Sequence, residues 1–140
     1  MKMLYYKVER DEEGNVLRTS LEPAEVTDKS GERLHEMYKL LDCELVDYRE
    51  FEVNGEYFDV WFDEEFLLRD KPPVATMFLG DLRPDSFIVL CGNLLFSKSN
   101  DEGESVTLTK RDMRKIMGFF DESQLKLMMA FSIGLINSRR

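Results

Sequence analysis

The sequence predicts a single α+β domain over residues 1–140, in which a mostly antiparallel sheet packs against two or three helices. Residues 43–63 form two alternating runs joined by Asn54-Gly55, the strongest short-range signal of a β-hairpin. Residues 87–96 are apolar almost throughout, as expected of a buried strand. Helix signals occupy three further segments, residues 31–41, 110–117 and 122–137.

The composition is that of a folded, acidic domain. Apolar residues make up 43% of the 140-residue chain, enough for a packed core without help from a metal or a disulfide. The net charge of −9 is uneven, because residues 1–70 carry 20 acidic and 9 basic side chains while residues 71–140 carry 8 and 10. An acidic surface repels nucleic acid and anionic lipid, so we expect no direct nucleic acid binding and favour a basic partner protein.

The chain shows no signal for secretion or for a membrane. Its two cysteines, Cys43 and Cys91, form neither a CxxC motif nor a disulfide scaffold. The first residues lack the apolar region of a signal peptide, and the longest apolar run, residues 127–136, is too short to span a bilayer. We therefore expect a cytoplasmic protein with no membrane contact and no cofactor.

The first elements in chain order are two short strands. Residues 3–8 and 16–19 are strand candidates on either side of a turn, and we expect them to pair. Residues 20–29 are polar and contain Pro23, which indicates a connecting loop.

A helix is predicted next, over residues 31–41. Asp28 or Ser30 can serve as its N-cap. Its apolar residues recur at helical spacing and form one stripe that can lie against a sheet: Leu34, Met37, Tyr38 and Leu41.

The hairpin at residues 43–63 determines which side chains share a face. A two-residue turn places Val53 opposite Glu56 and Glu50 opposite Asp59. Because side chains alternate along a strand, one face is apolar and carries Phe51, Phe58, Val60 and Phe62. The other face carries Tyr48, Glu50, Glu52, Tyr57, Asp59, Trp61 and Asp63.

The second half of the chain supplies the rest of the sheet. Residues 75–79 indicate a short strand or turn, and residues 105–108 a strand that returns after a turn. We expect residues 87–96 to be one central strand, in which Gly92-Asn93 marks a bulge or a close approach of the backbone.

Two helices are predicted to close the chain. Thr109 and Asp112 have the spacing of a capping box for a short helix over residues 110–117. Asp121 repeats the signal for a helix over residues 122–137, with its apolar stripe at Leu125, Met128, Met129, Leu135 and Ile136. The apolar arc is wider than one sheet face needs, which makes this helix a candidate homodimer contact.

The acidic and aromatic face of the hairpin is the strongest functional signal in the sequence. Like charges at Glu50 and Asp59 normally destabilise a sheet, and exposed Tyr and Trp side chains are typical anchors of interfaces. A non-enzymatic protein-binding function predicts the partner-binding residues Tyr48, Glu50, Glu52, Tyr57, Asp59 and Trp61. In the competing interpretation the face is solvated or is covered by another element, such as the last helix over Trp61.

A metal-dependent hydrolase or nuclease is the alternative function. The carboxylates of Asp59, Asp63 and Glu64 could ligate a magnesium-type ion. Such sites usually include a nearby Lys or His, and the hairpin contains neither. We therefore assign no catalytic residue and no metal ligand.

A series of short motifs follows the same order as in a known group of domains. The motifs are Val53-Asn54-Gly55, Phe58-Asp59-Val60, Asp63-Glu64-Glu65, Leu67-Leu68, Asp70-Lys71-Pro72, Cys91-Gly92-Asn93-Leu94, Asp101-Glu102-Gly103-Glu104 and Val106-Thr107-Leu108-Thr109. Over residues 40–116 the chain resembles a family of small domains of unknown function carried by phages and mobile elements of Gram-positive bacteria. Neither the amino-terminal segment nor the final helix belongs to the resemblance.

The resemblance implies a compact α+β fold and brings no catalytic residues. Short accessory proteins in such genetic settings are often counter-defence factors, including inhibitors of RNA-guided nucleases and of restriction. By this association of setting, the resemblance implies an inhibitor, of the anti-CRISPR or anti-restriction kind, that engages a basic host protein such as a nuclease.

Overall fold

The computed structural model of the chain describes residues 1–65 and 73–136. Within these residues it confirms the α+β class, with two helices, a six-stranded sheet and a two-stranded sheet. The motifs at Leu67-Leu68 and Asp70-Lys71-Pro72 lie outside the described residues. The expected helix end near Asn137 is wrong, because the last helix ends at Ser132 and residues 133–136 are not helical. In chain order the elements are β1 (Lys2–Arg10), β2 (Val16–Glu25), α1 (Ser30–Leu41), β3 (Val46–Val53), β4 (Glu56–Asp63), β5 (Ala75–Gly80), β6 (Phe87–Cys91), β7 (Leu94–Ser99), β8 (Ser105–Val106) and α2 (Lys110–Ser132).

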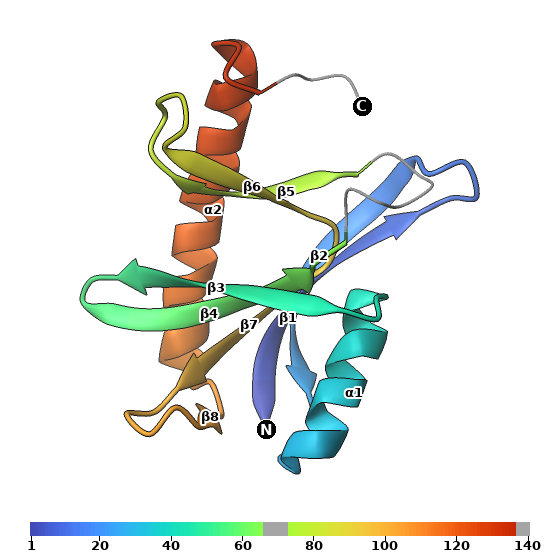
Figure 1. Cartoon of the computed structure of the whole chain (residues 1–140), viewed down its shortest axis with the longest axis vertical. Coiled ribbons are helices and arrows are strands. Elements are labelled where there is room, and N and C mark those ends of the chain that lie inside the picture. Colours follow the sequence, from blue (N-terminus) through green and yellow to red (C-terminus); the bar gives the residue numbers. More distant parts are fainter. Residues whose placement is uncertain (66–72, 137–140) are drawn as a thin grey trace.

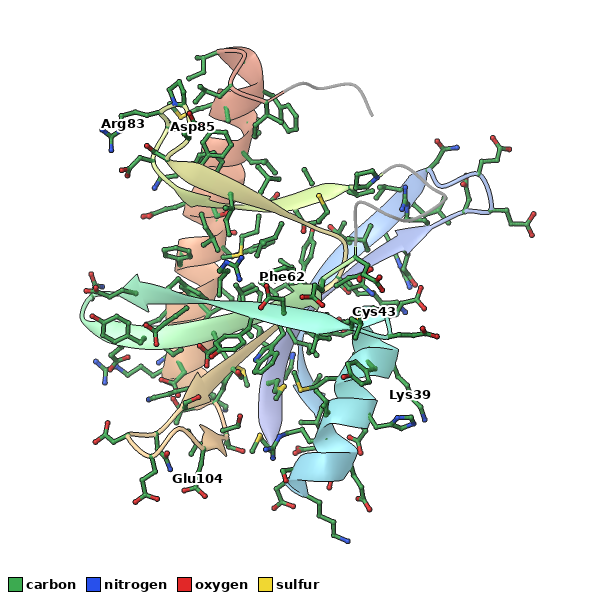
Figure 2. All side chains as sticks on the ribbon, in the orientation of Figure 1. Lys39, Cys43, Phe62, Arg83, Asp85 and Glu104 are labelled. Atoms are coloured by element: carbon green, nitrogen blue, oxygen red, sulfur yellow. The ribbon has the colours of Figure 1, made fainter. Side chains whose placement is uncertain are left out.

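The larger sheet has the strand order β2-β1-β7-β4-β3, with β8 paired to β7, and every pairing is antiparallel. The helices α1 and α2 lie on opposite faces of this sheet, and α2 extends past it to the two-stranded sheet of β5 and β6 (Figure 1). On the α2 side the buried side chains include Leu4, Phe96 and Ile116, and on the α1 side Met37 and Leu95. The larger sheet is therefore apolar on both faces near its centre. Figure 2 shows Phe62 in the interior of the molecule, between the hairpin β3–β4 and the smaller sheet.

The expected single strand over residues 87–96 is wrong. The run divides into β6, which pairs with β5, and β7, which is the central strand of the larger sheet. Gly92 between them has a φ of +77°, a conformation that favours glycine and turns the chain out of the first sheet. The Asn93 side chain fixes the position of this connection between β6 and β7. Its Oδ1 accepts the Val8 N–H at 2.9 Å, and its Nδ2 donates to the Leu40 carbonyl at 3.0 Å.

The amino-terminal strands pair as expected, with Val8 opposite Thr19, but they are longer than the sequence indicates. The segment 20–25, expected as part of a loop, continues β2 to Glu25. Pro23 lies in this strand opposite Leu4. A proline is tolerated there because β2 is an edge strand, where one side of the backbone needs no partner.

The helix α1 forms where the apolar spacing predicts it, but neither expected cap is used. The N-cap residue is Lys29, and its side chain makes no capping hydrogen bond. Met37 and Leu41 are buried as predicted, while Leu34 is 39% exposed at the outer edge of the stripe.

The two helices expected at the carboxyl-terminal end are one continuous helix, α2. Its start is confirmed: the Thr109 hydroxyl accepts the Asp112 N–H at 3.0 Å, and the Asp112 carboxylate accepts the Thr109 N–H at 2.9 Å. The second cap signal at Asp121 is overridden, because continuing the helix buries Phe120 and Leu127 in two different apolar clusters.

The predicted apolar stripe of this last segment is wrong for its three helical residues, whereas Ile136, beyond the helix end, is buried as predicted. Leu125, Met128 and Met129 are 60%, 64% and 52% exposed. In a continuous helix each residue turns by about 100°, so the burial of Met113, Ile116 and Phe120 determines which later residues face inward. Those residues are Ser123, Leu127 and Ala130.

Candidate protein-binding surface

The hairpin β3–β4 forms around the turn that the sequence predicts. Asn54 and Gly55 have φ values of +50° and +85°, as a type I′ turn requires. The predicted register is confirmed from Val53 opposite Glu56 to Tyr48 opposite Trp61. The predicted apolar face is confirmed as well, since Phe51, Phe58, Val60 and Phe62 are all buried.

The opposite face carries the six predicted partner-binding residues, here called the hairpin surface: Tyr48, Glu50, Glu52, Tyr57, Asp59 and Trp61. The structure divides them into two groups. Four are accessible, with Tyr48 and Tyr57 about half exposed and Glu50 and Glu52 exposed. Asp59 is buried, with 8% of its surface exposed, and Trp61 is half-buried. The hairpin surface therefore has an accessible outer part and a supporting inner part.

Trp61 is covered by α1, and the alternative in which the last helix covers it is wrong. Its ring contacts the cluster that includes Met37 and Leu41 of α1. Its indole N–H donates to the Ser97 hydroxyl on β7 at 2.8 Å, and its ring lies 4.8 Å from that of Tyr48. Trp61 is thus fixed on three sides and holds the partly exposed Tyr48 ring in position.

Asp59 lies between the neighbouring strands β3 and β7. Its Oδ2 accepts a hydrogen bond from the Ser99 hydroxyl at 3.2 Å, and Glu50 lies directly opposite on β3. Burial raises the pKa of Asp59; the Ser99 hydrogen bond opposes this shift, and the negative charge of Glu50 adds to it. Glu50 and Asp59 are therefore neighbours as the sequence predicts, and burial together with the Glu50 charge makes ionisation of Asp59 less favourable than in water.

Asp59→Asn is expected to raise the free energy of unfolding at neutral pH. The pKa of Asp59 is higher in the folded than in the unfolded protein, so this carboxyl's contribution to stability is complete below the unfolded pKa and is lost as the pH rises through the folded pKa. The asparagine is uncharged, and its carbonyl can still accept the Ser99 hydrogen bond. Thermal unfolding from about pH 3 to about pH 8 should show similar stability at the acid end and a more stable variant at the neutral end.

Asp121→Asn on the exposed side of α2 is the control for this comparison. This substitution also removes one negative charge, but the carboxylate that it removes is exposed and not buried. If Asp121→Asn and Asp59→Asn change the pH profile of stability alike, the net charge of the protein is responsible and the environment of Asp59 is not.

The carboxylates of the alternative hydrolase site do not come together. Asp63 is buried at the end of β4, where its Oδ1 accepts the Glu65 N–H at 2.8 Å. Among residues 1–65 and 73–136, no three His, Cys, Asp or Glu side chains are arranged to hold a metal ion. No described arrangement therefore favours Asp59, Asp63 and Glu64 as ligands of one metal.

Sequence reasoning missed the two serines that support the hairpin surface. Ser97 and Ser99 alternate with buried Phe96 and with Lys98 on β7, so they share the face of Asp59 and Trp61. This alternation is visible in the sequence. A single strand over residues 87–96 ends before both serines, so that prediction does not place them on the sheet.

A basic hollow is a second feature that the sequence did not indicate. It measures about 810 Å³ and opens between the β1–β2 hairpin and the end of α1, where Figure 2 shows Lys39. Its basic side chains are Lys7, Arg10, Arg18 and Lys39. Glu9 and Asp42 also line it, and Glu9 pairs with Arg18 and with Lys7, so the protein's own carboxylates neutralise part of this positive charge.

The fold and the hairpin surface together define an α+β domain with an acidic, tyrosine-bearing candidate binding surface. Residues 12–121 match a domain of unknown function, DUF3846, and because this match covers most of the chain, the chain belongs to that family. The match includes all of β2 and α1 and reaches Asp121 in α2, so the expected limits of the resemblance, residues 40–116, are too narrow. No curated protein and no solved structure matches the chain. Neither helix has the length and apolar character needed to cross a bilayer within the residues described.

Proposed function

We propose that this protein is a non-enzymatic binding module that engages a basic protein through the hairpin surface. One observation carries the proposal: two half-exposed tyrosines, Tyr48 and Tyr57, share one strand face with the exposed carboxylates of Glu50 and Glu52. Asp59 and Trp61 act from beneath as supports. In this proposal the exposed residues contact the partner, and the buried or half-buried residues hold them in place.

The chemistry of the outer part suits a basic partner. Tyrosine is enriched at interfaces because its ring supplies contact area at low entropic cost, while its hydroxyl forms hydrogen bonds. Carboxylates at the rim attract basic groups and accelerate association. Glu50 and Glu52 have no basic residue directly opposite on β4, since their partners are Asp59 and Tyr57. Neither carboxylate therefore forms an ion pair with its direct partner on β4, although the Glu52 carboxylate also accepts the Gly55 N–H at 3.2 Å.

Within this proposal the partner is a host protein that binds nucleic acid, such as a defence nuclease. The clefts of such proteins present Lys and Arg to phosphates, and a row of carboxylates offers a comparable negative charge. A counter-defence role in a phage or mobile element accords with this chemistry and with the resemblance described above. The proposed site of action is the cytoplasm, where such nucleases act.

The double variant Glu50→Gln/Glu52→Gln is expected to weaken binding to the partner by at least about tenfold. The partner is first captured from host lysate and identified by mass spectrometry, and the affinity of the purified pair is then measured at two salt concentrations. Binding by the unchanged protein should weaken as salt rises, since the attraction is between exposed charges.

Glu12→Gln/Glu13→Gln is the matched control, because it removes two exposed carboxylates from the β1–β2 turn. It should change the affinity little. An equal loss in both double variants would show that the net charge, and not the hairpin surface, governs binding. Unchanged affinity of Glu50→Gln/Glu52→Gln would overturn the proposed surface.

We also propose that two copies of the chain associate through the exposed apolar side chains near the end of α2. These residues lie on the side of the helix away from the core and are 52–64% exposed: Leu125, Met128, Met129 and Ile133. Sedimentation equilibrium should show a dimer that Met128→Lys dissociates while the far-UV circular dichroism spectrum of the folded chain stays the same. A monomer at all concentrations would remove this proposal.

A further inference from the structure

The strand β3 forms one edge of the larger sheet, and its register shows which of its backbone groups point away from β4. In the Asn54-Gly55 turn the Glu56 N–H bonds to the Val53 carbonyl, so Val53 and Glu56 are a hydrogen-bonded pair. Hydrogen-bonded and non-hydrogen-bonded pairs alternate in an antiparallel ladder. The N–H and C=O groups that point outward from β3 beside the turn therefore belong to Tyr48, Glu50 and Glu52.

Side chains satisfy some of these edge groups and leave others open. The Tyr48 N–H donates to the Asp47 carboxylate at 2.7 Å, and the Tyr48 carbonyl accepts the Arg49 guanidinium at 3.0 Å. No residue of the described chain bonds to the outward backbone groups of Glu50 and Glu52. The open part of the edge thus coincides with the two exposed carboxylates of the hairpin surface.

In the smaller sheet, by contrast, the outward backbone groups of the edge strand β5 are hydrogen-bonded by side chains. Phe78 of β5 donates its N–H to the Ser123 hydroxyl of α2 at 2.7 Å, and its carbonyl accepts from the same hydroxyl at 3.0 Å. The Thr76 carbonyl accepts from the Gln124 amide on the same helix. Helix α2 therefore covers β5 with side-chain donors and acceptors, whereas no residue within 1–65 and 73–136 covers the backbone of Glu50 and Glu52 in this way.

We propose that the partner adds an extended, basic segment to β3 as a further antiparallel strand at Glu50 and Glu52. This inference rests on the proposed function and names the form of its ligand. Strand addition lets main-chain hydrogen bonds supply affinity while alternate side chains supply specificity. Residues opposite Glu50 and Glu52 lie on the carboxylate side, so the segment carries Lys or Arg at alternate positions.

Charge argues against a second copy of this chain as the added strand. Antiparallel pairing of two β3 strands around Glu50 or Glu52 brings glutamates of the two copies opposite or diagonal to one another. Like charges in those positions destabilise a sheet, and charged edge strands commonly prevent self-association. A basic strand converts the same positions into attractive pairs.

The test uses a blocked peptide of alternating lysine and valine, titrated against the full chain up to millimolar concentration. In the proposed pairing the lysine amides face Glu50 and Glu52 and the valine amides face away. N-methylation of the lysine amides should weaken binding by about tenfold or more, while N-methylation of the valine amides, which adds the same number of methyl groups, should have little effect. Amide exchange at Glu50 and Glu52 should slow only with the peptides that bind.

The outcomes separate this inference from the proposed function. If both methylated peptides bind as well as the parent and Glu50→Gln/Glu52→Gln weakens all three, the acidic surface stands and strand addition is overturned. If the parent peptide binds Glu50→Gln/Glu52→Gln as tightly as the unchanged protein, or binds neither, the proposed function itself fails.

Discussion

Leu127→Ala is expected to lower the free energy of unfolding by about 3 kcal/mol. Leu127 is 7% exposed and lies in an apolar cluster with Phe78 and Ala130, beneath the smaller sheet. Truncation to alanine loses the buried methyl groups and leaves a cavity, because the backbone of α2 is held by contacts on both sides of this position. Urea denaturation monitored by circular dichroism measures the change.

Leu125→Ala on the same helix is the matched control. The two substitutions remove the same atoms and change helix propensity equally, but Leu125 is 60% exposed. At protein concentrations where the chain is monomeric, its replacement should alter the free energy of unfolding by no more than about 0.5 kcal/mol. The comparison also tests the orientation of α2, because the sequence alone places Leu125 in the buried stripe. A larger loss at Leu125 than at Leu127 would contradict the structure of this helix.

Ser123→Ala is expected to cost about 3 kcal/mol as well, although it removes a single oxygen. The Ser123 hydroxyl satisfies both the N–H and the carbonyl of Phe78, and Ser123 and Phe78 are 2% and 1% exposed. Alanine leaves two buried backbone groups without a partner, and each such group costs about 1–3 kcal/mol. Denaturant unfolding measures the loss.

Ser132→Ala at the exposed end of α2 is the control for the serine substitution. Alanine is the better helix former, so this variant should be neutral or slightly more stable. If Ser123→Ala behaved in the same way, the hydroxyl would contribute nothing to the contact between α2 and β5.

The hairpin β3–β4 could be predicted from the sequence almost completely. Asn54-Gly55 fixes the turn type locally, and the register and the division into faces follow from the period of a strand without reference to the rest of the chain. The capping box at Thr109 was predictable for the same reason, since it involves residues only three positions apart.

The errors concern elements whose structure depends on distant contacts. Residues 87–96 have the composition of one buried strand, and only their pairing with β5 on one side of Gly92 and with β1 and β4 on the other shows that there are two. Similarly, the inward side of α2 near its end is determined by Met113 and Ile116, which lie at its start. The local spacing of apolar residues therefore predicts neither the division of residues 87–96 nor the buried side of α2 near its end.

The candidate site shows the same limit. The sequence places Asp59 and Trp61 on the correct face, and this part of the prediction is confirmed. It does not reveal that α1 covers Trp61 or that β3 and β7 flank Asp59, because burial depends on neighbours from residues 30–41 and 94–99. The sequence therefore predicts which residues share the face, but only the structure shows which of them are exposed.

Helix α2 contacts both sheets, through Ile116 and Phe120 on the larger and through Ser123 and Leu127 on the smaller. Each helical residue adds about 100° of rotation and about 1.5 Å of length. One residue inserted between Phe120 and Ser123 would rotate the Ser123 hydroxyl away from β5. A full extra turn would restore its direction but shift it along the helix axis, beyond Phe78. The number of residues between Phe120 and Ser123 is therefore fixed by geometry, and insertions or deletions there are incompatible with this fold.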